Sequence, residues 1–128
     1  MTEIWHLRSD LPLDEAARRV FAALSVASFE ERDSENYPTG RYFLGRGPFG
    51  KIKVALESDA GFEDCRYWVV VSRAARPAGA AAQALAAAGL WVCRELPPSA
   101  GSARREVFEP LPDGRVTRRE ENAPPQMP

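Results

Sequence analysis

The segment 34–56 constrains the fold most, because its glycines and prolines decide where the chain must turn. Pro38 fixes its own φ in a range that turns use, and Gly40 adopts a positive φ without a Cβ clash. A second reversal is expected at 45–50, where glycine recurs beside a proline. The residues between and after these turns resemble strands, so the segment predicts a turn followed by an antiparallel hairpin.

The second strand of this hairpin is expected at 51–56, because apolar and charged residues alternate at its start. The alternation directs one set of side chains toward a core and the other toward water. Ile52, Val54 and Leu56 form the first set, and Lys51 and Lys53 the second.

Two helices are expected. The first follows Pro12, which suits a first helical turn, and its apolar residues recur at helical spacing: Leu13, Ala16, Ala17, Val20, Phe21 and Leu24. The second is expected over 78–96, after Pro77 and Gly79, with small residues along one side. Small residues allow a helix to lie close to a sheet.

Further strands are expected at 2–7, 26–29 and 66–73. The run 66–73 is apolar on both alternating faces and rich in β-branched and aromatic residues, which is typical of an inner strand covered on both sides. The sequence therefore predicts an α+β fold. It consists of one mostly antiparallel sheet of about five strands packed with two helices, in the order β-α-β-β-β-β-α.

The composition changes after residue 97, because seven of the eleven prolines lie between Pro97 and Pro128. We therefore interpret 1–97 as a single α+β domain and 98–121 as a polar, proline-rich extension. Whether this extension forms a hairpin around the turn signal at 112–114 stays open. Residues 122–128 are expected to form a flexible tail.

Composition and charge exclude several functional classes. With 128 residues, 45% hydrophobic and 27% charged, the chain has the balance of one globular domain. Its net charge of −1 gives no global field for binding nucleic acid or an acidic membrane. The first residues lack the pattern of a secretory signal, and no window is long and apolar enough to cross a bilayer. We therefore expect a cytoplasmic protein, in which Cys65 and Cys93 are free thiols.

No catalytic or metal-binding constellation is evident, and no cofactor is expected. The stretch 45–51 matches G-x-G-x-x-G, but a strand rather than a helix is expected after it, which favours a plain glycine-rich hairpin over a phosphate site. His6 is the only histidine, and the two cysteines lack the spacing of zinc ligands. Paired carboxylates between the acidic segments are conceivable, but a solvated acidic face is the simpler interpretation.

Acidic residues do gather in two segments, around 30–35 and 57–64. If both segments met at one edge of the sheet, they would form a negative patch able to steer a basic partner. The alternative is that neighbouring strands and loops neutralise them. The candidate contacts for a partner are Glu30, Glu31, Asp33, Glu35, Glu63 and Asp64.

Three sequence features together resemble a known class of proteins. The first is a strand followed by a helix that contains Leu-x-x-Ala-Ala-x-x-Val-Phe. The second is the segment 31–43, which reads Glu-Arg-x-Ser-x-Asn-Tyr-x-x-Gly-x-Tyr-Phe. The third is a pair of motifs, Tyr-Trp-Val at 67–69 and Ala-Ala-x-Gly-Leu-Trp-Val at 86–92. Over residues 3–96 this order is similar to immunity proteins of contact-dependent growth inhibition and related polymorphic toxin systems. The resemblance implies a cytosolic antitoxin that binds one toxin domain, usually a nuclease, and blocks its active site. It carries over no catalytic residue.

Two other classes remain as alternatives to an immunity protein. An adaptor or chaperone-like module would bind a peptide along an exposed sheet edge. A small-ligand enzyme would need a deep apolar pocket with convergent polar groups, for instance His6, Tyr37 and Arg41 lining one cavity. The sequence does not indicate the oligomeric state.

Overall fold

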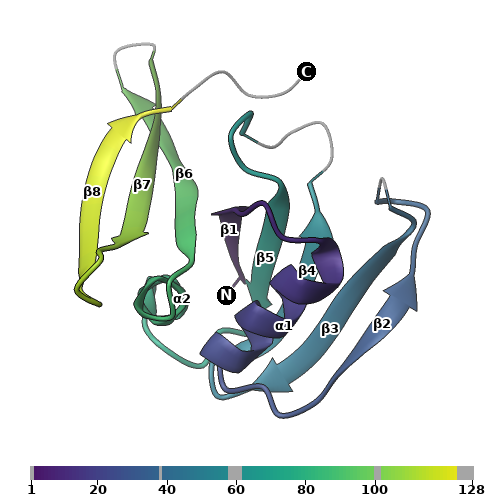
Figure 1. The fold of residues 1–128 in the computed structure, drawn as a ribbon. Helices are drawn as coiled ribbons and strands as arrows, with labels where there is room; N and C mark the ends of the chain where they lie inside the picture. Colours follow the sequence, from purple (N-terminus) through teal and green to yellow (C-terminus); the bar gives the residue numbers. More distant parts are fainter. Residues whose placement is uncertain (1, 38, 58–61, 100–101, 124–128) are drawn as a thin grey trace.

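The computed structural model describes residues 2–37, 39–57, 62–99 and 102–123. The described chain forms one antiparallel sheet and two helices (Figure 1). In chain order the elements are β1 (Thr2–Arg8), α1 (Leu13–Ala23), β2 (Phe29–Asp33), β3 (Arg41–Gly47), β4 (Gly50–Leu56), β5 (Tyr67–Ser72), α2 (Ala80–Ala87), β6 (Trp91–Ser99), β7 (Ser102–Pro110) and β8 (Val116–Asn122).

The sheet has eight strands in the order β2-β3-β4-β5-β1-β6-β7-β8, so the prediction of about five strands is wrong. The α+β class holds, but three strands lie beyond α2 and extend the sheet past β1. Strand β6 was missed because the segment after residue 90 reads as helix, whereas β7 and β8 form the hairpin that the sequence left open. Strand β1 lies at the centre, paired with β5 on one side and β6 on the other.

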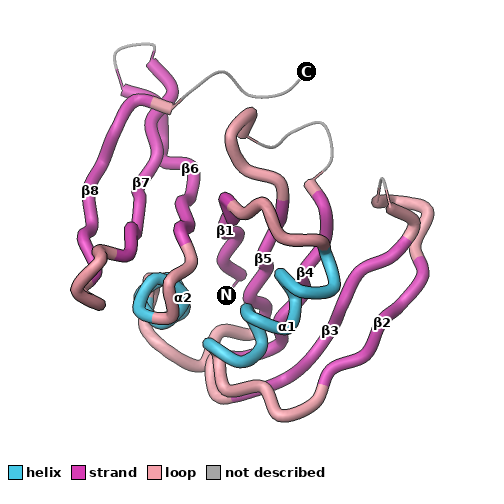
Figure 2. The backbone as a smooth tube through the Cα atoms, viewed as in Figure 1, coloured by secondary structure: helices cyan, strands magenta, loops and turns pink. Residues whose placement is uncertain are grey.

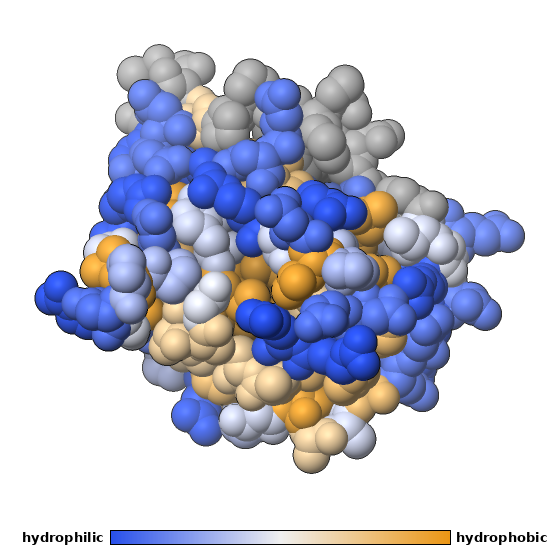
Figure 3. Space-filling view, viewed as in Figure 1, coloured by the Kyte–Doolittle hydropathy of each residue, from blue (hydrophilic) through white to orange (hydrophobic). Residues whose placement is uncertain are grey.

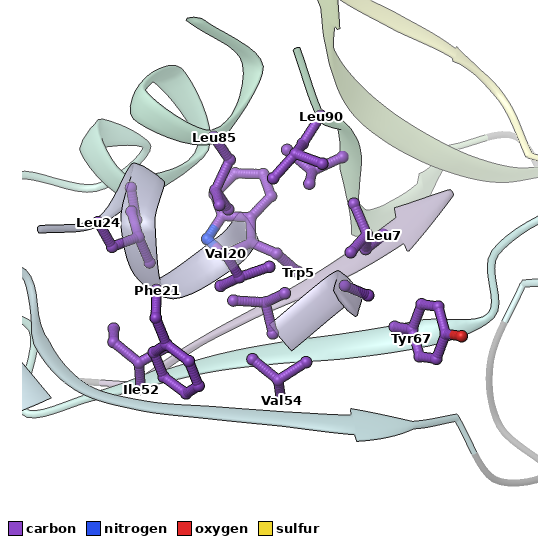
Figure 4. Packing of buried hydrophobic residues seen from close by; sticks show 14 of the residues in the cluster. Trp5, Leu7, Val20, Phe21, Leu24, Ile52, Val54, Tyr67, Leu85 and Leu90 are labelled. Carbon is purple, nitrogen blue, oxygen red and sulfur yellow. The ribbon is translucent and has the colours of Figure 1, made fainter. Parts of the chain in front are cut away.

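Both helices cover the same face of the curved sheet (Figure 2). The stripe of α1 lies where the sequence predicts it, with Leu13, Ala16, Ala17, Val20 and Phe21 buried. These residues pack on Trp5 of β1, on the inward side chains of β4 and β5, and on Leu85 of α2 (Figure 4). The outer side of this helical layer shows hydrophilic areas interspersed with several hydrophobic ones (Figure 3).

The second helix is shorter than predicted. It ends at Ala87, and the residues from Trp91 onward form β6 instead. Gly89, with φ of +93°, reverses the chain after the helix. Its N–H donates to Ala86 O at 2.9 Å, and the N–H of Leu90 donates to Leu85 O at 3.0 Å, which is the Schellman pattern of a helix end.

The acidic segment after Phe29 is strand β2, not a loop, so the strand expected at 26–29 begins three residues later. All five residues of β2 are exposed, because it forms one edge of the sheet. A short, charged edge strand of this kind resists pairing with another chain.

Strands β7 and β8 form an antiparallel hairpin that continues the sheet on the other edge. This hairpin has few apolar residues, and ion pairs join its strands instead. Glu106 lies between Arg94 of β6 and Arg118 of β8, and Arg104 pairs with Glu120. The prolines at 97 and 98 coincide with a register shift between β6 and β7. Of the predicted tail, residues 124–128 lie outside the described part of the chain.

Candidate functional site

The described residues cover only part of the face of the sheet opposite the helices. Side chains alternate along β1 and β5, so that Ile4, His6, Trp68 and Val70 all point to this second face. The register places Ile4 opposite Val70 and His6 opposite Trp68. Ile4 is 52% exposed, and Trp68 and Val70 are half-buried. We call the area formed by Ile4, Lys53, Trp68 and Val70 the uncovered face.

The remainder of the second face, over β1, β6 and β7, is buried under the residues that precede β5. Phe62 and Cys65 pack there against Trp91, Cys93 and Val107 in a second small core. Cys65 and Cys93 are free thiols, as expected, but they lie together in this core. A hydrogen bond with Cys93 and then burial raise the pKa of Cys65, which makes it a poor nucleophile.

A cavity of about 690 Å³ opens on the uncovered face. Its apolar wall is formed by Ile4, Val70 and Trp68, and Tyr37 from the β2–β3 turn stands beside Trp68 with ring centroids 6.4 Å apart. The polar and remaining lining residues are Thr2, Glu3, His6, Lys53, Ala78, Arg94 and Glu95. The cavity therefore joins an aromatic and aliphatic wall to several polar groups, which is the usual make-up of a binding site.

His6 lies at the boundary between the cavity and the second small core. It is 6% exposed, its ring stands edge-on to Phe62 at 4.7 Å between centroids, and its Nδ1 shares a hydrogen bond with Oε1 of Glu57. Burial raises the pKa of Glu57, and the hydrogen bond from His6 only partly opposes this effect. The second oxygen of Glu57, Oε2, is buried without a hydrogen-bond partner among the residues that the structure describes. Glu57 thus fixes the orientation of the imidazole from behind.

Arg105 organises the charges over the second small core. It is 3% exposed, donates to both oxygens of Asp64 at 2.8 and 3.0 Å, and also pairs with Glu121 at 2.7 Å. Arg8 adds a third hydrogen bond to Asp64, at 2.6 Å. Burial would raise the pKa of Asp64, but these two arginines outweigh it and hold that pKa well below its usual range. These ion pairs hold Asp64, in the segment before β5, against β1 and β7.

Cations gather at the β3–β4 side of the uncovered face. The ammonium of Lys53 lies over the rings of Tyr37 and Tyr42, 5.5 and 5.6 Å from their centroids. Within the described residues, Lys51, Lys53 and Arg46 have no carboxylate at ion-pair distance. This part of the surface is therefore locally basic although the whole chain carries a net charge of −1.

The two acidic segments lie apart in the sheet. Glu30, Glu31 and Asp33 are on edge strand β2, and Glu35 is exposed in the turn after it. Asp64 instead contacts β1 and β7, with β3, β4 and β5 between it and β2, and Glu63 is exposed beside it. The condition for one continuous negative patch is therefore not met.

Several of these acids have basic partners. Glu30 pairs with Arg32, and Glu31 pairs with Arg41 at 3.2 Å. Arg41 also donates to Asp14 of α1 at 2.6 Å, so it lies on the helix side of the sheet. Of the three residues suggested as lining one cavity, His6 and Tyr37 do so and Arg41 does not.

Other sequence motifs have ordinary structural roles. The glycine-rich stretch forms the β3–β4 hairpin, in which Gly47 pairs with Gly50. In the described residues, no three His, Cys, Asp or Glu side chains come close enough to hold a metal ion. Neither helix in that part of the chain has the length and hydrophobicity to span a membrane.

The sequence interpretation missed the residues of the uncovered face. It treated the run 66–73 as covered on both sides, whereas Trp68 and Val70 are only half-buried. The apolar run was visible in the sequence, but the fact that both helices lie on one face and leave the other with little cover is known only from the fold. Ile4 and Lys53 could be added only once the register was known.

Comparison with protein families, curated proteins and solved structures finds no match to this chain. The cavity and the surface around it are therefore the basis for inferring a function.

Proposed function

We propose that this chain is a cytoplasmic immunity protein that binds and neutralises a cognate toxin domain, and that it docks through the uncovered face. The observation that carries the proposal is the group of apolar side chains on the second face, with Ile4 52% exposed beside Val70 and Trp68. The solvent side of an antiparallel sheet normally carries polar residues. An apolar group rimmed by charges is typical of a surface that a protein partner covers.

The chemistry of this surface suits binding better than turnover. Aromatic side chains and a cation surround the cavity, and such residues dominate the binding energy of protein interfaces. The one histidine has its Nδ1 occupied by Glu57, the nearby thiols are buried, and the pKa of Cys65 is raised. A partner that docks on the face between β3 and β1 has to bury the ~1,000 Å² that a stable interface needs.

The acidic residues of β2 and of 63–64 are a rival docking surface. Because Glu30, Glu31 and Asp64 already have arginine partners, a basic toxin would have to displace those contacts. Glu35 has no such partner among the described ion pairs and is the best residue for testing this rival surface.

The proposal predicts that a large exported protein with a variable carboxyl-terminal domain is encoded directly upstream of this gene, and the experiment co-expresses that domain with this chain. We expect cells that die from the toxin domain alone to survive when this chain is present. The two proteins should also co-purify through size-exclusion chromatography with a nanomolar dissociation constant. The control is an unrelated toxin domain of the same activity, against which no protection is expected.

Death of the co-expressing cells, or survival without a complex, would refute the proposed function. Equal protection against the unrelated toxin domain would also refute it, because a docking surface is specific to its partner.

A further inference from the structure

The cavity on the uncovered face holds an ammonium group that the protein itself leaves without a counter-ion. Lys53 reaches over Tyr37 and Tyr42, and none of the ion pairs between described residues includes it. The two rings keep the ammonium at the rim of the cavity through cation–π contacts. An ammonium group held in this way can form an ion pair with a carboxylate of another molecule.

His6 provides a second polar group in the cavity. Its side chain is more than nine-tenths buried, and Glu57 occupies Nδ1. The remaining ring nitrogen, Nε2, has no hydrogen-bond partner among the described residues, although His6 lines the cavity. The buried carboxylate behind the ring fixes which nitrogen faces a ligand.

The other charged residues of the lining are mostly engaged elsewhere. Oε1 of Glu3 accepts from Trp5 Nε1 at 3.1 Å and from the Gly79 N–H at 3.2 Å. Arg94 donates to Glu106 at 2.8 Å. Glu95 is exposed on β6, on the opposite side of β1 from Lys53. The β4 side of the cavity is therefore cationic, and Ile4, Val70 and Trp68 form the apolar wall next to it.

We propose that this cavity is the anchor site of the docking surface, and that it receives an acidic side chain of the partner protein together with a neighbouring large apolar side chain. The carboxylate pairs with Lys53, and the apolar group packs on Trp68, Val70 and Ile4. This inference rests on the proposed function, and it specifies a partner surface that is acidic at the point of contact.

The test uses three blocked dipeptides that differ in one side chain: tryptophan followed by glutamate, by glutamine or by lysine. Each is titrated into the isotopically labelled full chain, and the amide and indole resonances are followed by NMR. We expect saturable shifts at Ile4, Trp68 and Val70 with roughly millimolar dissociation constants. The glutamate dipeptide should bind about fivefold more tightly than the glutamine dipeptide, and the lysine dipeptide most weakly.

Lys53→Met and Lys51→Met form a matched pair of variants, because both lysines lie on the same face of β4 but only Lys53 lines the cavity. Lys53→Met should bring the preference for glutamate over glutamine close to one. Lys51→Met should leave the fivefold preference in place. Both substitutions are at partly exposed positions, so both variants should fold.

Four results would overturn the inference. These are the absence of saturable shifts, shifts outside the cavity, a lysine dipeptide that binds as well as the glutamate dipeptide, or an unchanged preference in Lys53→Met. A short oligouridine that shifts the same resonances more strongly than the glutamate dipeptide would also overturn it, since aromatic and basic groups suit single-stranded RNA.

The dipeptide test and the toxin experiment can contradict their two hypotheses separately. A toxin domain that binds while the charge preference is absent would contradict only the anchor chemistry. A clear preference without a toxin complex would contradict only the identity of the partner.

Discussion

Glu57 and Asp64 lie on either side of one loop, and their surroundings shift their pKa values in opposite directions. Glu57 is buried, and His6 is its one side-chain partner among the described residues, so desolvation prevails and its pKa rises. Asp64 receives three hydrogen bonds from two arginines, so its pKa falls despite burial. The two carboxylates therefore act on stability with opposite signs.

The first prediction concerns Glu57→Gln. In the folded chain Glu57 stays protonated at pH values above its ordinary pKa of 4.5. The free energy of unfolding therefore falls as the pH rises from 4.5 through the raised pKa. Glutamine can still accept from His6 and carries no charge. Urea unfolding should therefore show the variant gaining stability relative to the natural chain between pH 4 and pH 7. The same trend in Glu63→Gln, an exposed acid in the same loop, would assign the effect to general charge instead.

The second prediction concerns Asp64→Asn. The lowered pKa of Asp64 means that its ionised form stabilises the fold above pH 3.8 and that this contribution is lost as the pH falls below that value. We expect the substitution to cost about 1–3 kcal/mol at pH 7, because it leaves the buried Arg105 with fewer partners. The cost measured at pH 3 should be smaller. An equal cost at both pH values would contradict the assigned role of the charge.

The sequence pointed to individual residues but not to their partners. His6 stood out as the single histidine, yet its contact with Glu57 joins positions 51 residues apart and depends on the loop before β5. The two thiols meet in one small core for the same reason. Contacts of this range follow from strand order, which composition and spacing do not reveal.

At the scale of elements, local patterns were reliable where one signal dominated. The apolar stripe of α1 and the glycine-rich turn of the β3–β4 hairpin both determine structure over a few residues. The stretch after Gly79 carried two conflicting signals, an alanine-rich helix and then Trp91, Val92 and Cys93, which favour a strand. The glycine between them marked the boundary.

The third prediction concerns that glycine. Gly89 has φ of +93°, and a Cβ there would meet nothing within 4 Å, so substitution has a backbone cost only. Gly89→Ala should lower the free energy of unfolding by about 1 kcal/mol, measured by urea unfolding. Gly89→Asn should cost less, because asparagine tolerates the left-handed region. Equal losses for both variants would contradict this explanation of where α2 ends.

At the scale of the whole molecule, the two helices cover only one of the two faces of the sheet. The loop before β5 covers part of the second face, and the apolar residues of β1 and β5 remain beside it. The sequence showed the apolar run but could not show the deficit, because β6 was read as the end of a helix and the β7–β8 hairpin was left open. The uncovered face is thus a property of the assembled fold.

The central claim is that this face, rather than the acidic edge, docks the partner. The most direct test is a calorimetric titration of the toxin domain that this chain protects against with two variants, Ile4→Asp on the uncovered face and Glu35→Lys on the acidic edge. Both positions are exposed, and thermal unfolding can verify that both variants fold. We predict that Ile4→Asp weakens binding by about 30-fold or more, while Glu35→Lys changes it less than about twofold. A large loss in Glu35→Lys with unchanged affinity in Ile4→Asp would contradict the claim.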